Sequence, residues 1–284
     1  MLKKLFKYDW KSFWKVPAAI NLFLVLITII GILSFYSPVW RTQNNFIDVL
    51  MVSSMMLYLL TIFAGSIGIL VYTAIRYYKN VYTDEGYLTN TLPVTPRQII
   101  LSKMLNGVIW YLITYIVIAV SVFSLTFSAL NSYEHINLFV EIKNGLAEAS
   151  LMFAQEVGIS LSGFIVFIII SCIIGSFFSV IMAYSSISLG QLFTKHKAMG
   201  AVIWYIAEYI IVQMGTSLLM NVPFGISLFK SGGITGTMIY PDLYTKPIMY
   251  LKPIMIGSLI ITLILSVVFF FISEYMLKKK LNLD

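Results

Sequence analysis

Long apolar runs separated by short polar segments dominate the amino-acid sequence. A transmembrane helix needs about 20 mostly apolar residues, and six runs reach that length. We expect the spans at residues 16–36, 49–75, 108–130, 157–189, 198–220 and 254–276. Two glutamates fall inside these runs: Glu274 in the last turn of the sixth and Glu208 near the middle of the fifth. The pattern predicts an all-α integral membrane protein with six transmembrane helices, in which residues 1–284 form a single transmembrane domain.

Composition and charge support this assignment and predict an orientation. Of the 284 residues, 59% are hydrophobic and 11% are charged, whereas a soluble domain carries about 25% charged residues. Fourteen of the 19 Lys and Arg residues lie on the side of the predicted spans that carries both termini. Loops rich in Lys and Arg stay in the cytoplasm, so we expect cytoplasmic termini. Topology then explains the net charge of +7, and no nucleic-acid partner is needed.

Residues 1–15 combine a helical apolar repeat with lysines on the remaining faces. Spacings of three and four relate the apolar positions Leu2, Leu5, Phe6, Trp10, Phe13 and Trp14. This pattern predicts an amphipathic helix that lies in the membrane interface, with Phe6, Trp10 and Trp14 as its anchors. The alternative is a basic flank of the first span whose periodicity is accidental.

The connection between the second and third spans, residues 76–107, contains a helix start and an acidic segment. Thr95, Pro96 and Gln98 form an N-terminal capping signature, so a helix should begin at Pro96 and continue into the third span. The segment before it mixes acids with Tyr and Leu, which suits docking into a groove on another protein. The alternative is a solvated loop that only connects two spans.

Two other connections are predicted to be external. Residues 131–156 carry Glu134, Glu141 and Glu148 at a spacing of seven, which predicts an acidic amphipathic helix. This helix is either a solvated face or a surface that handles a cationic substrate. Residues 221–253 are rich in Pro and Gly and yet strongly apolar, which indicates a segment that re-enters the outer leaflet.

The sequence contains no motif for catalysis or for an energy source of its own. No glycine is followed by lysine, which excludes a P-loop for ATP, and the zinc motif H-E-x-x-H is absent. Glu208 is the only carboxylate deep within a predicted span. It is either functional, because a buried charge in lipid is costly, or a carboxylate satisfied by Ser or Tyr hydroxyls at a helix contact. We expect a chain that is not an enzyme and binds neither metal nor cofactor.

The residues of the 76–107 connection resemble the membrane subunit of ABC-2 type (type V) exporters, and the layout of the whole chain is similar to that family. The motif reads Thr83-Asp-Glu-Gly86-Tyr-Leu88-Thr-Asn-Thr-Leu92-Pro93-Val94, followed by Ser102-Lys103. The resemblance implies a coupling helix that docks on a separately encoded ATPase through Asp84, Glu85, Gly86, Tyr87, Leu88, Leu92 and Pro93. It also implies a translocation path bordered by Trp204, Glu208 and Gln213, capped by residues 221–253.

The same resemblance implies the partners and the location. Two ATPase subunits would hold ATP and Mg²⁺, and a second permease, identical or paralogous, would complete the path in a bacterial cell membrane. The apolar and aromatic spans favour an amphipathic cargo, so we expect export of bacteriocin-like or phenol-soluble-modulin-like peptides. Three alternatives stay open: an exporter of drugs, lipids or ions, a membrane sensor or immunity subunit that moves nothing, and a secondary carrier that uses Glu208.

Overall fold

The computed structural model describes residues 2–35, 45–83, 85–86, 93–133, 138–230 and 251–279, and over these ranges the chain forms only helices and their connections. Within these ranges, six helices are long and apolar enough to cross a membrane, which confirms the predicted all-α architecture. Their candidate spans are Lys15–Phe35, Ser53–Tyr82, Pro96–Ala129, Leu161–Gly190, Lys197–Leu219 and Ile254–Lys279. The protein is therefore a multi-pass membrane protein in contact with a lipid bilayer.

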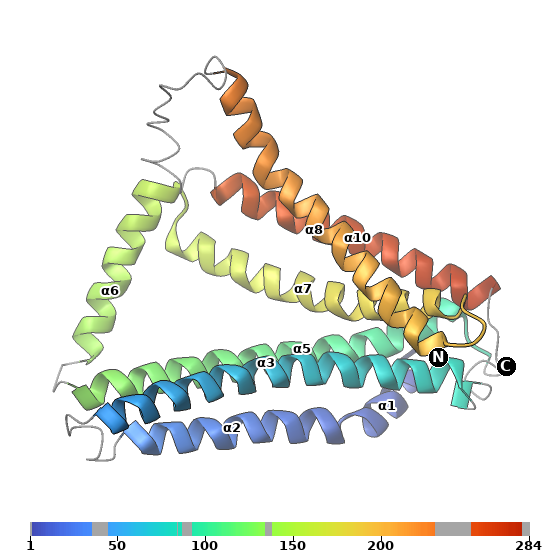
Figure 1. Ribbon diagram of the computed structural model, residues 1–284, viewed down its shortest axis with the longest axis horizontal. Helices are drawn as coiled ribbons and strands as arrows, with labels where there is room; N and C mark the ends of the chain where they lie inside the picture. The colour runs from blue at the N-terminus through green and yellow to red at the C-terminus, as the bar shows by residue number, and fades with distance from the viewer. Residues whose placement is uncertain are drawn as a thin grey trace. The chain divides into compact units, whose positions relative to one another are not determined.

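Residue contacts divide the described chain into two compact units, one up to Ile142 and the other from Lys143 onward. The first unit contains the helices α1 (Leu2–Phe13), α2 (Lys15–Phe35), α3 (Asn45–Tyr82) and α5 (Pro96–Tyr133). Helix α5 contacts each of the other three. Helices α2, α3 and α5 run side by side, and α1 continues α2 at one end (Figure 1). The first unit is thus a helical bundle with α1 at one of its ends.

Helix α5 begins where the sequence predicts. The backbone N–H of Gln98 donates to Thr95 Oγ1, and the N–H of Thr95 donates to Gln98 Oε1. The donor–acceptor distance is 3.4 Å in both hydrogen bonds. This reciprocal arrangement is a capping box, which satisfies backbone donors that the helix itself leaves unpaired. The helix then runs without a break from Pro96 to Tyr133. The capped segment and the third span are therefore one continuous helix.

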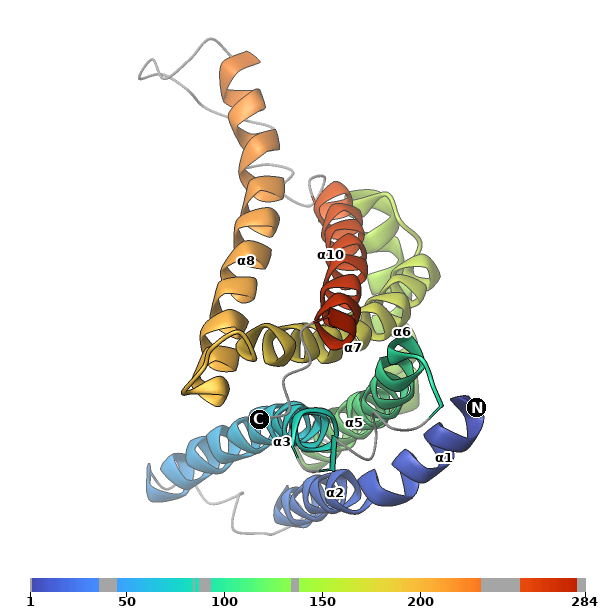
Figure 2. The same cartoon turned by 90° about the vertical axis from the view of Figure 1, so that its right-hand side faces the viewer.

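The second unit contains α7 (Leu161–Gly190), α8 (Lys197–Lys230) and α10 (Leu251–Lys279), each of which contacts the other two (Figure 2). Helices α7 and α8 form a hairpin with close backbone approach. A Cβ atom added at Gly190 would lie 2.5 Å from the backbone nitrogen of Ala201. Small residues at such contacts let two membrane helices approach closely.

The fourth span starts later than the predicted residue 157. A π-helical turn, Phe153–Val157, ends at Gly158, whose φ of 65° lies in the left-handed region. Ser160 then caps α7, because its side chain accepts a hydrogen bond from the N–H of Gly163 at 3.1 Å. A turn and a new cap therefore separate α7 from the preceding helical residues.

The two connections predicted to be external are described only in part. Helix α6 (Leu138–Met152) occupies most of residues 131–156 and exposes Glu148, whereas Glu134 lies outside the described residues. Helix α8 continues to Lys230, beyond the predicted end of the fifth span. Residues 231–250 lie outside the described residues, so the re-entrant segment stays a prediction.

Candidate functional site

Helix α1 packs on α5 and α3 through aromatic rings. Trp10 stacks on Trp110 of α5, with 5.4 Å between ring centroids and 19° between planes. Phe6 lies against Trp10 at 6.0 Å. Phe13, which is 5% exposed, contacts Tyr72 of α3 at 5.0 Å between centroids. The apolar face of α1 is thus fixed to the protein, while its lysines are exposed.

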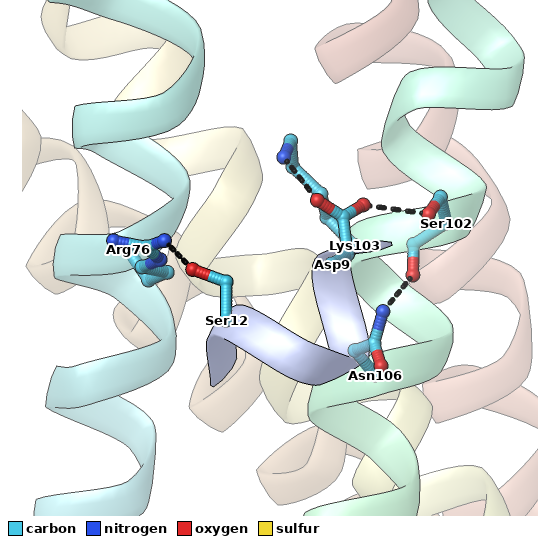
Figure 3. A network of polar contacts seen from close by, with 6 residues as sticks. All are labelled: Asp9, Ser12, Arg76, Ser102, Lys103 and Asn106. Atoms are coloured by element: carbon cyan, nitrogen blue, oxygen red, sulfur yellow. Dashed lines mark hydrogen bonds and ion pairs between the residues drawn. The ribbon is translucent and has the colours of Figure 1, made fainter. Parts of the chain in front are cut away.

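A largely buried ion pair joins α1 to α5 (Figure 3). Lys103 Nζ donates to Asp9 Oδ1 at 3.1 Å, and Ser102 Oγ donates to Asp9 Oδ2 at 2.7 Å. The side chain of Lys103 is 7% exposed and that of Asp9 is 15% exposed. A buried ammonium without a carboxylate costs several kcal/mol. Asp9 therefore offsets the free-energy cost of burying the Lys103 ammonium.

The same lysine connects to the segment that resembles a coupling helix. In the orientation of the Asn80 amide that satisfies both its atoms, the oxygen accepts from Lys103 Nζ at 3.2 Å and the nitrogen donates to Glu85 Oε2 at 2.5 Å. Asn80 lies in the last turn of α3. Asp9, Lys103, Asn80 and Glu85 thus form a continuous series of polar contacts from α1 through α5 and α3. We call these four residues the polar chain.

Two further contacts hold the same region. Arg76 of α3 donates to the hydroxyl of Ser12 on α1 (Figure 3). The N–H of Gly86 donates to the carbonyl of Thr83 at 2.6 Å. Gly86 is buried, and a Cβ atom there would run into the backbone carbonyl of Val81. Glycine is therefore the residue that fits this turn without a backbone shift.

We expect Gly86→Ala to loosen the turn at residues 83–86, because the new Cβ meets backbone and not a flexible side chain. Hydrogen exchange of the amides in residues 81–86 should become faster by about tenfold, which corresponds to about 1.4 kcal/mol. The control is Gly145→Ala in α6, where an added Cβ has nothing within 4 Å. Unchanged exchange in residues 81–86 would contradict the tight turn.

The structure describes some of the residues predicted to dock on an ATPase. Glu85 is exposed and belongs to the polar chain, Gly86 is buried in the turn, and Pro93 is exposed shortly before the capping box. The others lie outside the described residues: Asp84, Tyr87, Leu88 and Leu92. Their docking role stays a prediction.

Sequence reasoning missed two members of the polar chain. The motif of the 76–107 connection includes Lys103, but no sequence pattern predicts a role for Asp9 or Asn80. A signal was present, since Asp9 is the only acidic residue of a lysine-rich helix. Among the predicted interfacial anchors, Trp10 stacks on Trp110 of α5 and Phe6 contacts Trp10 within α1, whereas Trp14 is 46% exposed.

The polar chain has no feature of a metal site. Within the described part of the chain, no group of three His, Cys, Asp or Glu side chains could hold a metal ion.

Comparison with known protein families, curated proteins and solved structures finds no match. The function must therefore be argued from the residues and geometry of this chain.

The second unit places Glu208 at the contact between α8 and α7. Glu208 is 3% exposed, and the hydroxyl of Ser185 on α7 faces its carboxylate. Trp204 Nε1, one turn earlier on α8, is buried without a partner among the described residues. Gln213 is exposed on another side of α8, where its amide donates to the hydroxyl of Tyr209 at 2.8 Å. The structure thus brings Glu208 and Trp204 together and separates Gln213 from them.

Glu208→Leu is expected to stabilise the protein by about 1–2 kcal/mol. An apolar side chain of similar volume removes a buried carboxylate that the hydroxyl of Ser185 faces but that has no cation beside it among the described residues. Thermal unfolding of the purified protein in detergent measures the effect, and Glu148→Leu on the exposed side of α6 should change nothing. A lower unfolding temperature for Glu208→Leu would mean that the carboxylate has a stabilising partner.

Proposed function

We propose that this chain is the transmembrane subunit of an ATP-driven exporter, in which the polar chain couples the spans to a separate ATPase. The observation that supports the proposal best is the continuous contact from Glu85 through Asn80 and Lys103 to Asp9. These contacts join three helices to the one connection whose sequence resembles a coupling helix.

A coupling element must transmit a displacement and not absorb it. Glu85 is exposed, so it is the member of the polar chain that a partner at this surface would touch. Behind it, Asn80 and Lys103 connect to α3 and α5, and the ion pair of Lys103 with Asp9 adds α1. Packed interiors transmit strain because they have low compressibility. A push on Glu85 therefore moves the ends of three helices, and α5 continues from there as an unbroken helix across the bilayer.

The family resemblance supplies the remaining parts of the proposed exporter. Two copies of the ATPase hold ATP and Mg²⁺, and a second permease, identical or paralogous, completes the path. The cargo is an amphipathic peptide. The acidic residues Glu141 and Glu148 of helix α6 favour a peptide with basic residues. In this scheme both termini and the polar chain face the cytoplasm of a bacterial cell.

Affinity purification from the native membrane tests the proposal. The tagged chain is isolated, co-purifying proteins are identified, and ATP hydrolysis is assayed. A P-loop ATPase should accompany the wild type and should be lost with Glu85→Arg. The control Glu148→Arg makes the same charge change on an exposed residue of α6 and should retain the ATPase. If folded wild-type protein never brings down an ATPase, the exporter proposal fails.

A further inference from the structure

A groove of about 640 Å³ runs between α2 and α3 in the first unit. Its volume lies within the range of small-molecule sites, roughly 300–1,000 Å³. Small residues create the hollow: Ala19 on α2 and Ala64, Gly65 and Gly68 on α3. Neither the proposed ATPase contact nor the polar chain uses these residues.

The groove is apolar except at one end. Lys15, the first residue of α2, lines that end and is exposed. The hydroxyl of Thr61, which also lines the groove, already donates to the carbonyl of Leu57 at 2.8 Å. A molecule in the groove would therefore meet hydrocarbon along its length and one cation at its end.

The length of the groove can be compared with the bilayer. Its lining covers residues 15–24 of α2 and 57–68 of α3, about 14 Å and about 16 Å at a rise of 1.5 Å per residue. Half of the hydrocarbon core of a bilayer is about 15 Å thick. The groove is long enough to reach from one membrane surface to at least the middle of the bilayer.

We propose that this groove holds one acyl chain of an anionic phospholipid, whose headgroup phosphate pairs with Lys15. Charge complementarity selects this occupant. A zwitterionic lipid carries the same phosphate but also a cationic group that weakens its attraction to Lys15, and an apolar helix from a second copy offers no anion at all. The neighbouring helix α1 adds exposed lysines, including Lys7 and Lys11, and basic residues near a membrane surface attract anionic lipids. The site does not depend on the proposed exporter function.

Photo-crosslinking in bilayers tests the site. The full-length protein is reconstituted with phosphatidylglycerol or phosphatidylcholine that carries the same photoreactive acyl chain, and crosslinks to the groove residues are mapped by mass spectrometry. The yield from phosphatidylglycerol should exceed that from phosphatidylcholine by about fivefold. Lys15→Ala should remove this preference, whereas Lys4→Ala, an exposed lysine of α1 outside the groove, should keep it.

A second variant tests the groove itself. Ala64→Phe should fill the hollow and lower the yield from both lipids by about fivefold or more. Ala119→Phe, an exposed position on α5 outside the groove, is the matched control. Unfolding temperatures verify that both variants fold. If Ala64→Phe does not fold, the loss of lipid preference in Lys15→Ala is the deciding result. Equal crosslinking yields from the two lipids would overturn the proposal. So would a wild-type dimer that Ala64→Phe dissociates, if the crosslinking yield is also independent of the headgroup.

Discussion

Replacing Asp9 with leucine is expected to lower the stability of the protein by about 3 kcal/mol. The substitution leaves the ammonium of Lys103, which is 7% exposed, without its carboxylate, and breaking a buried ion pair from one side is strongly destabilising. The purified protein should unfold about 5–10 °C earlier in detergent. An unchanged unfolding temperature would contradict the ion pair.

Exchanging the two charges tests whether the stability lost in Asp9→Leu comes from the ion pair and not from other effects of that substitution. The double variant Asp9→Lys with Lys103→Asp should recover part of the lost stability. Ser102 can follow the exchange, because a hydroxyl both donates and accepts. The recovery is incomplete because an Asn80 amide that turns to donate to the new carboxylate presents its oxygen to Glu85. Lys103→Asp alone should be as damaging as Asp9→Leu, since it places two carboxylates together.

The second large effect is expected at the α7–α8 hairpin. Gly190→Ala should destabilise the protein by at least about 2 kcal/mol, because overpacking against rigid atoms forces backbone shifts. The added Cβ would lie 2.5 Å from the nitrogen and 2.8 Å from the Cα of Ala201. Thermal unfolding in detergent again provides the measurement.

The same substitution elsewhere on α7 supplies the control. Gly175 has nothing within 4 Å of an added Cβ, so Gly175→Ala should stabilise the helix by about 0.5–1 kcal/mol through backbone entropy. Opposite signs for the two variants would support the close contact of α7 and α8. A stability gain for both would contradict it.

The predictions that the structure confirms rest on local signals. Six spans could be placed because each is a run of about 20 mostly apolar residues, and the start of α5 could be placed because Thr95 and Gln98 lie within one turn of each other. The start of α7 was missed because the run from residue 157 onward stays apolar through the turn. Gly158 and Ser160 were the only local signals there, and both residues are also common inside membrane helices.

The polar chain could not be predicted because its members are far apart in the sequence. Lys103 and Asp9 are separated by 94 residues, and their meeting depends on how α1 packs on α5. The stacking of Trp10 on Trp110 is equally non-local. Sequence also placed Glu208 deep within a span, but only the α7–α8 contact shows that it shares a buried face with Trp204 and that Gln213 does not.

Transport into inside-out membrane vesicles tests most directly whether ATP drives this protein. Vesicles that contain the chain and its co-purified ATPase are given a fluorescent cationic amphipathic peptide. We predict uptake with ATP, no uptake with a non-hydrolysable analogue, and no effect of ionophores that collapse proton and sodium gradients. Uptake that requires an ion gradient but no ATP, or ATP hydrolysis without any uptake, would contradict an ATP-driven exporter of amphipathic peptides.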